Sequence, residues 1–396
     1  MRILIVSTHD SRGGAANAAY RFSKEFIKQG HEVCFYVRDK KKEDSFIKQS
    51  NTPKWIAKIL HFVDFLPGFI LSGFNRDVNF TLGLFGESLN PIIKEFKPDI
   101  INIHWTWKGF VSFPEICRVS RKIPVVWTMH DYSPFSGGKF YPEQGEKKLI
   151  KLVAKINVVL RRIFCKRANI EFVSPSEFLA KEFQKVSFSH NQNIAVINNG
   201  VDTGIFKKLN KINARTELGL KNGKKYILFG AVNILENKIK GGRFLKSLFK
   251  DIEDYLLTKN IGLVSFGSQN PFPQFNLVNS IEQIFLGYVK DERKMVKILS
   301  SSDIMLVPSF FENYPFVVME SLACSVPVVA FNTGGIPEMI EHKKNGFLAK
   351  FDSSDSFKEG IVYCLEEKLD NQRDFSIEKK AKNYIELFNN CLHTNR

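Results

Sequence analysis

The apolar and polar positions of the chain predict short buried strands that alternate with amphipathic helices. Short apolar runs rich in β-branched residues are typical of parallel strands that are covered on both faces. They occur at residues 3–7, 33–37, 99–103, 124–129, 172–175, 195–197, 226–230, 261–267, 285–289, 304–307 and 326–331. Helices are expected between them, and Ser176 is a good N-cap for residues 177–184. The alternation predicts an α/β protein, and 396 residues suffice for two such domains.

Polar segments interrupt this pattern. Residues 40–54 are charged, and we interpret them as a loop. The polar run 207–225 is the expected linker between the two domains. A last helix is expected at residues 376–390.

Two carboxylates follow the strand 304–307. Glu312 is expected in the loop after this strand, and Glu320 in the helix that Pro315 opens. Gly334 to Pro337 is expected to open another helix after the strand 326–331. Helix N-termini beside glycines favour anions, and carboxylates accept hydrogen bonds from hydroxyls. The stretch therefore predicts a site for a ligand with phosphates and hydroxyls.

Glycines and lysines mark two further strand-to-helix loops. Lys240-Gly241 follows the strand 226–230, and a lysine is a suitable point charge for phosphate. Gly13-Gly14 follows the first strand, where the pair either lets the backbone approach a phosphate or merely eases a tight turn. The G-x-G-x-x-G pattern of dinucleotide-binding loops is missing there, so the sequence does not support a hydride-transfer cofactor.

The stretch 303–346 resembles one family closely. Glu312 and Glu320 enclose seven residues, Pro308-Ser309 precedes them, Pro327-Val328-Val329 follows, and then come GG-x-PE and Asn345-Gly346. This order is similar to that of the retaining nucleotide-sugar glycosyltransferases of family 4, which have the GT-B fold. The resemblance implies two Rossmann-like α/β domains that face each other across a cleft. It also implies that the last helix crosses back to the first domain.

The resemblance also assigns roles to the domains. The NGVD-x-x-x-F pattern that ends at Phe206 resembles the entry to the family's hinge. We therefore expect an acceptor-binding domain at residues 1–205, joined by the helix at 376–396, and a donor-binding domain at residues 206–375.

The resemblance implies a donor site in the second domain. Lys240 would contact the diphosphate, Glu320 the ribose hydroxyls and Glu312 the sugar hydroxyls. Many members have an arginine in the region of Asn233, and Lys238 is expected to compensate for it here. The remaining expected donor-binding residues are Gly13, Gly14, Gly267, Asn313, Tyr314 and Pro315, together with Tyr288 and Val289 at the nucleobase.

His130 and Asp131 come directly after the strand 124–129, and we expect the pair to project into the cleft. In the resembled family a histidine here contacts the donor sugar, so His130 and Glu312 are the expected catalytic residues. A hydrogen-bonded histidine at a strand end is the structural alternative. The phrase WTMHDYSPFSGGKFY resembles the branch that builds bacterial exopolysaccharide and lipopolysaccharide, although Lys139 stands where that branch often has cysteine.

The resemblance implies that the anomeric configuration is retained. The sequence contains no Asp-x-Asp motif, so we expect transfer without a metal ion, with the nucleotide sugar as substrate and no cofactor. The expected acceptor is a saccharide, and we expect it to be lipid-linked. A nucleotide-sugar epimerase of the same fold remains an alternative. A nucleic-acid-binding protein is a weaker one, because the basic residues are dispersed and no recognition motif is present.

Charge and cysteines suggest where the protein acts. The formal net charge is +16, and the six cysteines are scattered, as is common in a reducing cytoplasm. Residues 3–6 are too short for the core of a signal peptide. The aromatic segment 55–90 and the basic segment 147–167 either pack as ordinary surface helices or contact an anionic membrane. We therefore expect a cytoplasmic protein, peripheral on the inner face of the plasma membrane if those segments bind lipid.

Overall fold

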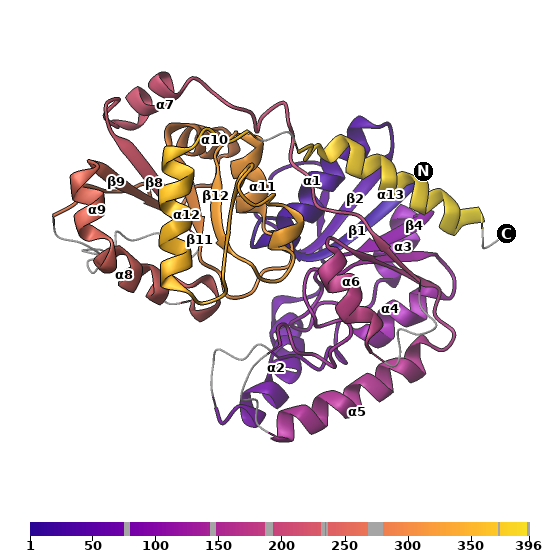
Figure 1. Ribbon diagram of the computed structural model, residues 1–396. Coiled ribbons are helices and arrows are strands. Elements are labelled where there is room, and N and C mark those ends of the chain that lie inside the picture. Colours follow the sequence, from indigo (N-terminus) through magenta and orange to yellow (C-terminus); the bar gives the residue numbers. More distant parts are fainter. Residues whose placement is uncertain are drawn as a thin grey trace. The chain divides into compact units, whose positions relative to one another are not determined.

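The computed structural model describes residues 1–74, 80–142, 148–186, 193–230, 234, 237–267, 280–370 and 373–393 (Figure 1). Contacts divide the chain into two compact units. The first unit is Met1–Asn199 with Ile377–Arg396, and the second is Gly200–Ser376. Residues 200–206 belong to the second unit, because the Val201 amide donates to the Phe375 carbonyl at 2.9 Å and Phe206 lies in the second unit's core.

Within the described residues, the first unit contains a parallel sheet in the order β3-β2-β1-β4-β5-β6-β7. The strands are β1 Arg2–His9, β2 Glu32–Asp39, β3 Ile47–Gln49, β4 Ile100–Ile103, β5 Val125–Thr128, β6 Ile170–Ser174 and β7 Ile194–Val196. The helices are α1 Gly14–Lys28, α2 Lys54–Leu71, α3 Asn90–Phe96, α4 Phe113–Ser120, α5 Lys148–Cys165, α6 Glu177–Gln184 and α13 Ile377–His393. The strand order reverses between β1 and β4, and the carboxyl ends of strands at such a point are where open α/β sheets bind ligands.

The described part of the second unit contains a parallel sheet in the order β10-β9-β8-β11-β12-β13. The strands are β8 Lys225–Gly230, β9 Ile261–Phe266, β10 Gln283–Phe285, β11 Ile304–Val307, β12 Val328–Phe331 and β13 Gly346–Ala349. The helices are α7 Lys211–Leu218, η2 Lys238–Lys240, α8 Gly242–Asp251, α9 Glu253–Thr258, α10 Glu292–Ser301, α11 Phe316–Ala323, η3 Ile336–Glu338 and α12 Ser354–Glu366, where η marks a 3₁₀ helix. Here the strand order reverses between β8 and β11.

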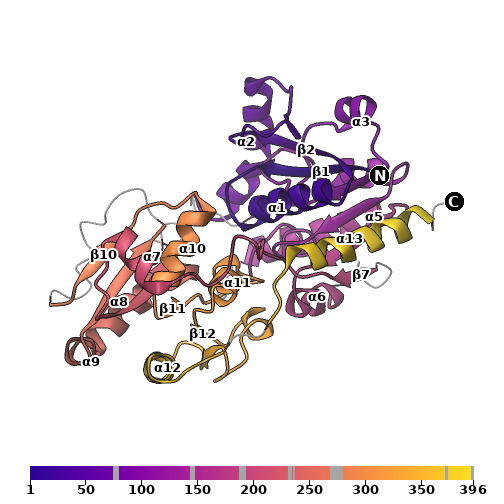
Figure 2. The same cartoon turned by 90° about the horizontal axis from the view of Figure 1, so that it is seen from above.

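The C-terminal helix α13 packs on the first unit, beside α1 (Figure 2). The ring of Tyr384 meets Phe22 edge-on at 4.7 Å between centroids, and Phe388 meets Phe26 at 5.6 Å. The Tyr384 hydroxyl also shares a hydrogen bond with Thr128 Oγ1 at the end of β5, at 2.9 Å. The expected return of the last helix to the first domain is therefore present.

Two polar segments contain regular structure that the sequence analysis missed. Residues 40–54 include β3, which pairs with β2. The expected linker 207–225 includes α7, whose Asn210 caps the N-terminus and whose Gly219 ends the helix with φ 70°. Arg215 of α7 is buried and pairs with Asp303 at 2.9 Å. A charged residue such as Arg215 can therefore belong to the packed interior of a segment whose other charged residues are mostly exposed.

Three boundaries near the expected donor site also differ from expectation. Gly334 to Pro337 does not open an α-helix, since only the three-residue turn η3 forms there. The chain then continues into β13, which pairs with β12 and was not predicted. The strand expected at 285–289 ends at Phe285, because Gly287 has φ 71° and leaves the extended conformation. Of the two α-helix N-termini that were expected at this site, that of α11 is therefore present, and the second is replaced by the turn η3.

None of the described helices is long and apolar enough to cross a membrane.

Candidate active site

The loops that follow β8 and β11 meet where the strand order of the second unit reverses. Lys240 ends η2, which comes after β8, and Glu312 lies in the loop after β11. The Lys240 Nζ is 2.5 Å from Glu312 Oε1. The Glu312 side chain is 13% exposed and that of Lys240 is 32% exposed, so the pair is partly shielded from water. Lys240 and Glu312 were expected to contact different parts of the donor, whereas the fold pairs them directly.

Main-chain hydrogen bonds fix these loops to each other. The Phe310 amide donates to the Ile239 carbonyl at 2.8 Å, and the Gly335 amide donates to the Glu312 carbonyl at 3.0 Å. Thr333 Oγ1 donates to the Phe310 carbonyl at 3.1 Å. The loops after β8, β11 and β12 therefore form one connected structure around the ion pair.

Two glycines allow the close approach of these loops. Gly241 has φ 73°, and a Cβ placed on it would lie 2.0 Å from the Pro308 carbonyl oxygen. Gly334 has φ 57°, and its Cβ would lie 1.9 Å from the Glu312 carbonyl oxygen. Both positions therefore require glycine for backbone conformation and for space.

The segment after Glu312 leads into α11. Asn313, Tyr314 and Glu320 are each 9% exposed, and Glu320 lies in the second turn of the helix. Burial raises the pKa of Tyr314 to about 12, so its phenol stays protonated at neutral pH. Pro315 is the N-cap and not a residue of the first turn, with φ −72° and ψ 128°. It prolongs the loop by one residue before the helix begins.

The remaining expected donor residues lie on neighbouring strand ends. Gly267, just beyond β9, donates its amide to the Gly287 carbonyl at 2.9 Å. Tyr288 follows and is exposed, whereas Val289 is half-buried. Lys238 is exposed at the first position of η2. Asn233 lies outside the described residues.

In the first unit, His130 follows β5 and contacts the histidine that follows β4. The distance from His104 Nδ1 to His130 Nε2 is 2.9 Å, and His104 Nε2 is 2.9 Å from Asn102 Oδ1. Asn102 Nδ2 donates to the Val126 carbonyl at 3.0 Å and to Thr128 Oγ1 at 3.1 Å. Sequence reasoning did not select His104 or Asn102, because neither belongs to a recognisable motif.

These contacts determine where the hydrogens of the two histidines lie. Since the Asn102 amide nitrogen faces two acceptors, its oxygen accepts a hydrogen from His104 Nε2. His104 Nδ1 then carries no hydrogen and accepts one from His130 Nε2. Burial lowers the pKa of His130 to about 3 and that of His104 well below its ordinary value. Both rings are neutral at pH 7, and Nδ1 of His130 can only accept a hydrogen bond.

Asp131, which follows His130, is hydrogen-bonded within the first unit. Its carboxylate is buried, where it accepts from Trp105 Nε1 at 3.0 Å and from the Ser133 amide at 2.8 Å. Burial raises the pKa of Asp131 to about 6, although these hydrogen bonds oppose the shift. Asp131 therefore holds the turn after β5 and the indole beside it.

Gly13 and Gly14 are exposed at the start of α1. Gly13 is the N-cap with φ 87°, a conformation that explains the glycine without a ligand. The described residues include no group of three or more His, Cys, Asp or Glu arranged to hold a metal ion.

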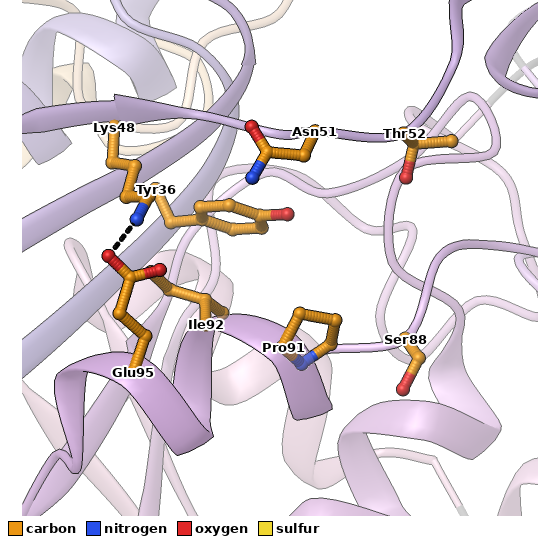
Figure 3. A pocket seen from close by; sticks show the side chains of 8 residues that line it. All are labelled: Tyr36, Lys48, Asn51, Thr52, Ser88, Pro91, Ile92 and Glu95. Atoms are coloured by element: carbon orange, nitrogen blue, oxygen red, sulfur yellow. Dashed lines mark hydrogen bonds and ion pairs between the residues drawn. The ribbon is translucent and has the colours of Figure 1, made fainter.

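The first unit also has a small pocket of about 200 Å³ between β2, β3 and α3 (Figure 3). Tyr36, Asn51 and Ser88 contribute to its wall, and Lys48 pairs with Glu95 across it. None of these residues was predicted to be functional.

Comparisons with known proteins agree with this arrangement. The family model Glycosyltransferase Family 4 matches residues 12–204, and the model Glycosyl transferases group 1 matches residues 210–383. A relative named as the colanic acid biosynthesis glycosyl transferase WcaC of Escherichia coli is 23% identical over 86% of this chain and 85% of its own. The UDP-Gal:alpha-D-GlcNAc-diphosphoundecaprenol alpha-1,3-galactosyltransferase of Escherichia coli is 24% identical over 75% of this chain and 74% of its own. The solved structure of Anabaena Alr3699/HepE in complex with UDP-glucose is 16% identical, with a TM-score of 0.60, and covers 100% of this chain and 99% of its own. The protein is therefore a glycosyltransferase with the GT-B fold, as its two parallel α/β units, the connected loops around Lys240 and Glu312, and these matches along the chain indicate.

Proposed function

We propose that this glycosyltransferase moves a sugar from a nucleotide-sugar donor to a saccharide acceptor during the synthesis of a cell-surface polysaccharide, with retention of the anomeric configuration. The observation that carries the proposal is the Lys240–Glu312 ion pair where the strand order of the second unit reverses. The names of the relatives support the pathway, and the resemblance of the stretch 303–346 to a retaining family is the support for retention.

The ion pair gives the donor a specific way to bind. Without a ligand, Lys240 and Glu312 neutralise each other. A diphosphate offers Lys240 a stronger anionic partner, and Glu312 is then available to accept hydrogen bonds from sugar hydroxyls. Glu320 would accept from the ribose hydroxyls. The charge that develops on the leaving diphosphate would be stabilised by Lys240, with Lys238 near it in the sequence.

His130 would act on the donor sugar as a hydrogen-bond acceptor. With its Nε2 hydrogen directed to His104, its Nδ1 can receive a sugar hydroxyl but cannot donate to one. His130 would therefore orient the sugar and assist no proton transfer from its ring at neutral pH. We propose that the lysines meet the need for positive charge, so that neither a metal ion nor a cofactor takes part.

We propose a lipid-linked saccharide as the acceptor. One relative is named for an acceptor on diphosphoundecaprenol, a lipid carrier. An acceptor of this kind would place the enzyme in the cytoplasm at the inner face of the plasma membrane.

The test is incubation with a panel of UDP, GDP and ADP sugars, followed by measurement of nucleoside diphosphate release. We expect slow release from one donor, and a rise in melting temperature with the same donor. Glu312→Gln and His130→Ala should still bind the nucleoside diphosphate, but turnover should fall about 100-fold or more. Glu367→Gln, an exposed residue after α12, is the matched control and should leave turnover unchanged.

Three other results of these assays would contradict the proposal or part of it. An isomerised nucleotide sugar would favour the epimerase, and no effect of any nucleotide sugar would refute the proposal. Normal turnover in either variant would restrict that residue to a structural role.

A further inference from the structure

Helix α5 exposes a row of large apolar residues. Its buried residues are Ala154, Asn157, Arg161 and Cys165. Its most exposed apolar residues are 53–63% exposed and are Leu149, Leu152, Ile156, Val159 and Ile163. The two sets lie mainly two residues apart, which is about 200° around a helix, so they occupy opposite sides. The usual orientation of an amphipathic surface helix is thereby inverted.

Polar contacts hold α5 in this orientation. The Arg161 guanidinium donates to the carbonyls of Pro134 at 2.9 Å and Leu82 at 3.0 Å. The Asn157 amide donates to the carbonyls of Leu82 and Gly137, both at 2.9 Å. A rotated helix would leave these buried polar groups without hydrogen-bond partners, which is unfavourable for the amide and more so for the charged guanidinium. The exposed apolar row is thus a consequence of the fold and not a mispositioned helix.

Helix α2, which packs beside α5, has the same character (Figure 1). Its buried residues are Asp64 and Gly68, and Asp64 accepts a hydrogen bond from the Gly83 amide at 2.8 Å. Its exposed apolar residues, with Phe74 just beyond the helix, are Trp55, Ile59, Phe62, Ile70 and Phe74. We call the exposed apolar residues of α2 and α5 the apolar face.

Positive charge lies along the apolar face. Lys148, Lys151, Lys155 and Arg162 are exposed, and each comes one residue before an apolar member of the row on α5. They therefore lie about 100° from that row around the helix. Helix α5 contains no Asp or Glu, and the single acidic residue of α2, Asp64, is buried. The exposed surface of both helices combines apolar and cationic side chains.

We propose that the apolar face and its basic border bind an anionic lipid bilayer. A second copy of the chain fits less well, because a two-fold contact would bring the same basic rows together. An anionic bilayer matches both components, since apolar side chains enter the headgroup region while lysine and arginine meet lipid phosphates. The inference deepens the proposed function, because it would bring the enzyme to a lipid-linked acceptor.

The test is sedimentation of the full chain with vesicles of phosphatidylcholine, with or without phosphatidylglycerol. We expect binding only to the anionic vesicles at low salt, and release at high salt. Two combined variants should each weaken binding about tenfold or more. The first removes apolar side chains and carries Leu152→Gln, Ile156→Gln and Val159→Gln. The second removes positive charges and carries Lys148→Gln, Lys151→Gln, Lys155→Gln and Arg162→Gln. Quenching of Trp55 by brominated lipid, measured against Trp55→Phe, should show that the face enters the bilayer.

The matched control neutralises four exposed lysines of the second unit, Lys207→Gln, Lys208→Gln, Lys294→Gln and Lys358→Gln, and should bind as the wild type does. Equal loss of binding in this control, or no binding of the wild type to anionic vesicles at low salt, would overturn the proposal. A wild-type dimer that the apolar substitutions convert to a monomer would instead show that a second copy covers the face. Donor cleavage is measured separately, so a protein that binds vesicles but cleaves no donor would refute the proposed function alone.

Discussion

At the scale of residues, the Lys240–Glu312 pair leads to a test of donor binding. Lys240→Ala should weaken binding of the nucleoside diphosphate about tenfold or more, because a cation facing the phosphates is lost and Glu312 is left beside them. Glu320→Ala should also weaken binding, through the lost ribose contact. Calorimetric titration measures both. The double variant Lys240→Ala with Glu312→Gln should recover part of the affinity lost in Lys240→Ala, since the unpaired carboxylate is removed.

Unchanged affinity in Lys240→Ala or Glu320→Ala would remove that residue from the donor site. Lys358→Ala, an exposed lysine on α12, is the control for the loss of one positive charge.

The histidines give a pH-dependent test. Because the folded state lowers the pKa of His104 and of His130, both bind fewer protons when folded, and the free energy of unfolding should fall as the pH drops below about 6.5. Each buried histidine contributes a slope of up to about 1.4 kcal/mol per pH unit. Denaturant titrations between pH 7 and pH 5 should show a smaller slope in His104→Phe than in the wild type. Equal slopes would mean that His104 is protonated without cost.

The same variant tests the assigned tautomer. Imidazole ¹⁵N shifts should show hydrogen on Nε2 of His130 in the wild type, and a mixture of tautomers in His104→Phe, because the acceptor that selects the tautomer is gone. A wild-type His130 with hydrogen on Nδ1 would contradict the deduced network. His342→Phe, in the second unit, serves as the control because its ring contacts Phe347 and not this network.

At the scale of elements, the loops around the ion pair depend on Gly241 and Gly334. A Cβ at either position would lie about 2 Å from a carbonyl oxygen, and φ is positive at both. Gly334→Ala should therefore lower the free energy of unfolding of the second unit by about 1–3 kcal/mol and also weaken donor binding, since the Glu312 carbonyl must move. Chemical denaturation and calorimetric titration measure the two effects.

Gly223→Ala is the matched control, because a Cβ there meets no atom within 4 Å and Gly223 has no positive φ. A Gly334→Ala protein with wild-type stability and wild-type donor affinity would show that the close packing of these loops is unnecessary.

At the scale of the whole molecule, the C-terminal helix α13 completes the first unit. Tyr384 is fully buried among Phe22 and Phe26 and shares a hydrogen bond with Thr128. Tyr384→Ala should lower the free energy of unfolding of the first unit by about 3–5 kcal/mol, since a large buried ring is lost. Tyr384→Phe should cost about 1 kcal/mol, the usual value of one buried hydrogen bond. Denaturation followed by fluorescence of Trp107 and Trp127, both buried in that unit, measures the change.

Equal free energies of unfolding for Tyr384→Ala and Tyr384→Phe would contradict this role of α13. Leu387→Ala, on the same helix but less buried, should cost less than Tyr384→Ala.

The sequence by itself determined the fold class, most of the strands, the helix limits at 177–184 with its Ser176 cap, and the order of motifs from Glu312 to Gly346. Apolar strand cores and capping residues are local signals, which is why a linear pattern was enough. The tertiary structure alone decided which distant residues meet: Lys240 with Glu312, and His130 with His104. Their separation in the chain gives no sign of these contacts, because parallel strands bring together loops from remote segments.

The tertiary structure also decided the orientation of α5. The basic segment 147–167 was expected to lie at the surface, yet its Arg161 is fully buried. Carbonyl groups from two other segments face that side of the helix, and hydrogen bonds to them outweigh the preference of the apolar row for the interior.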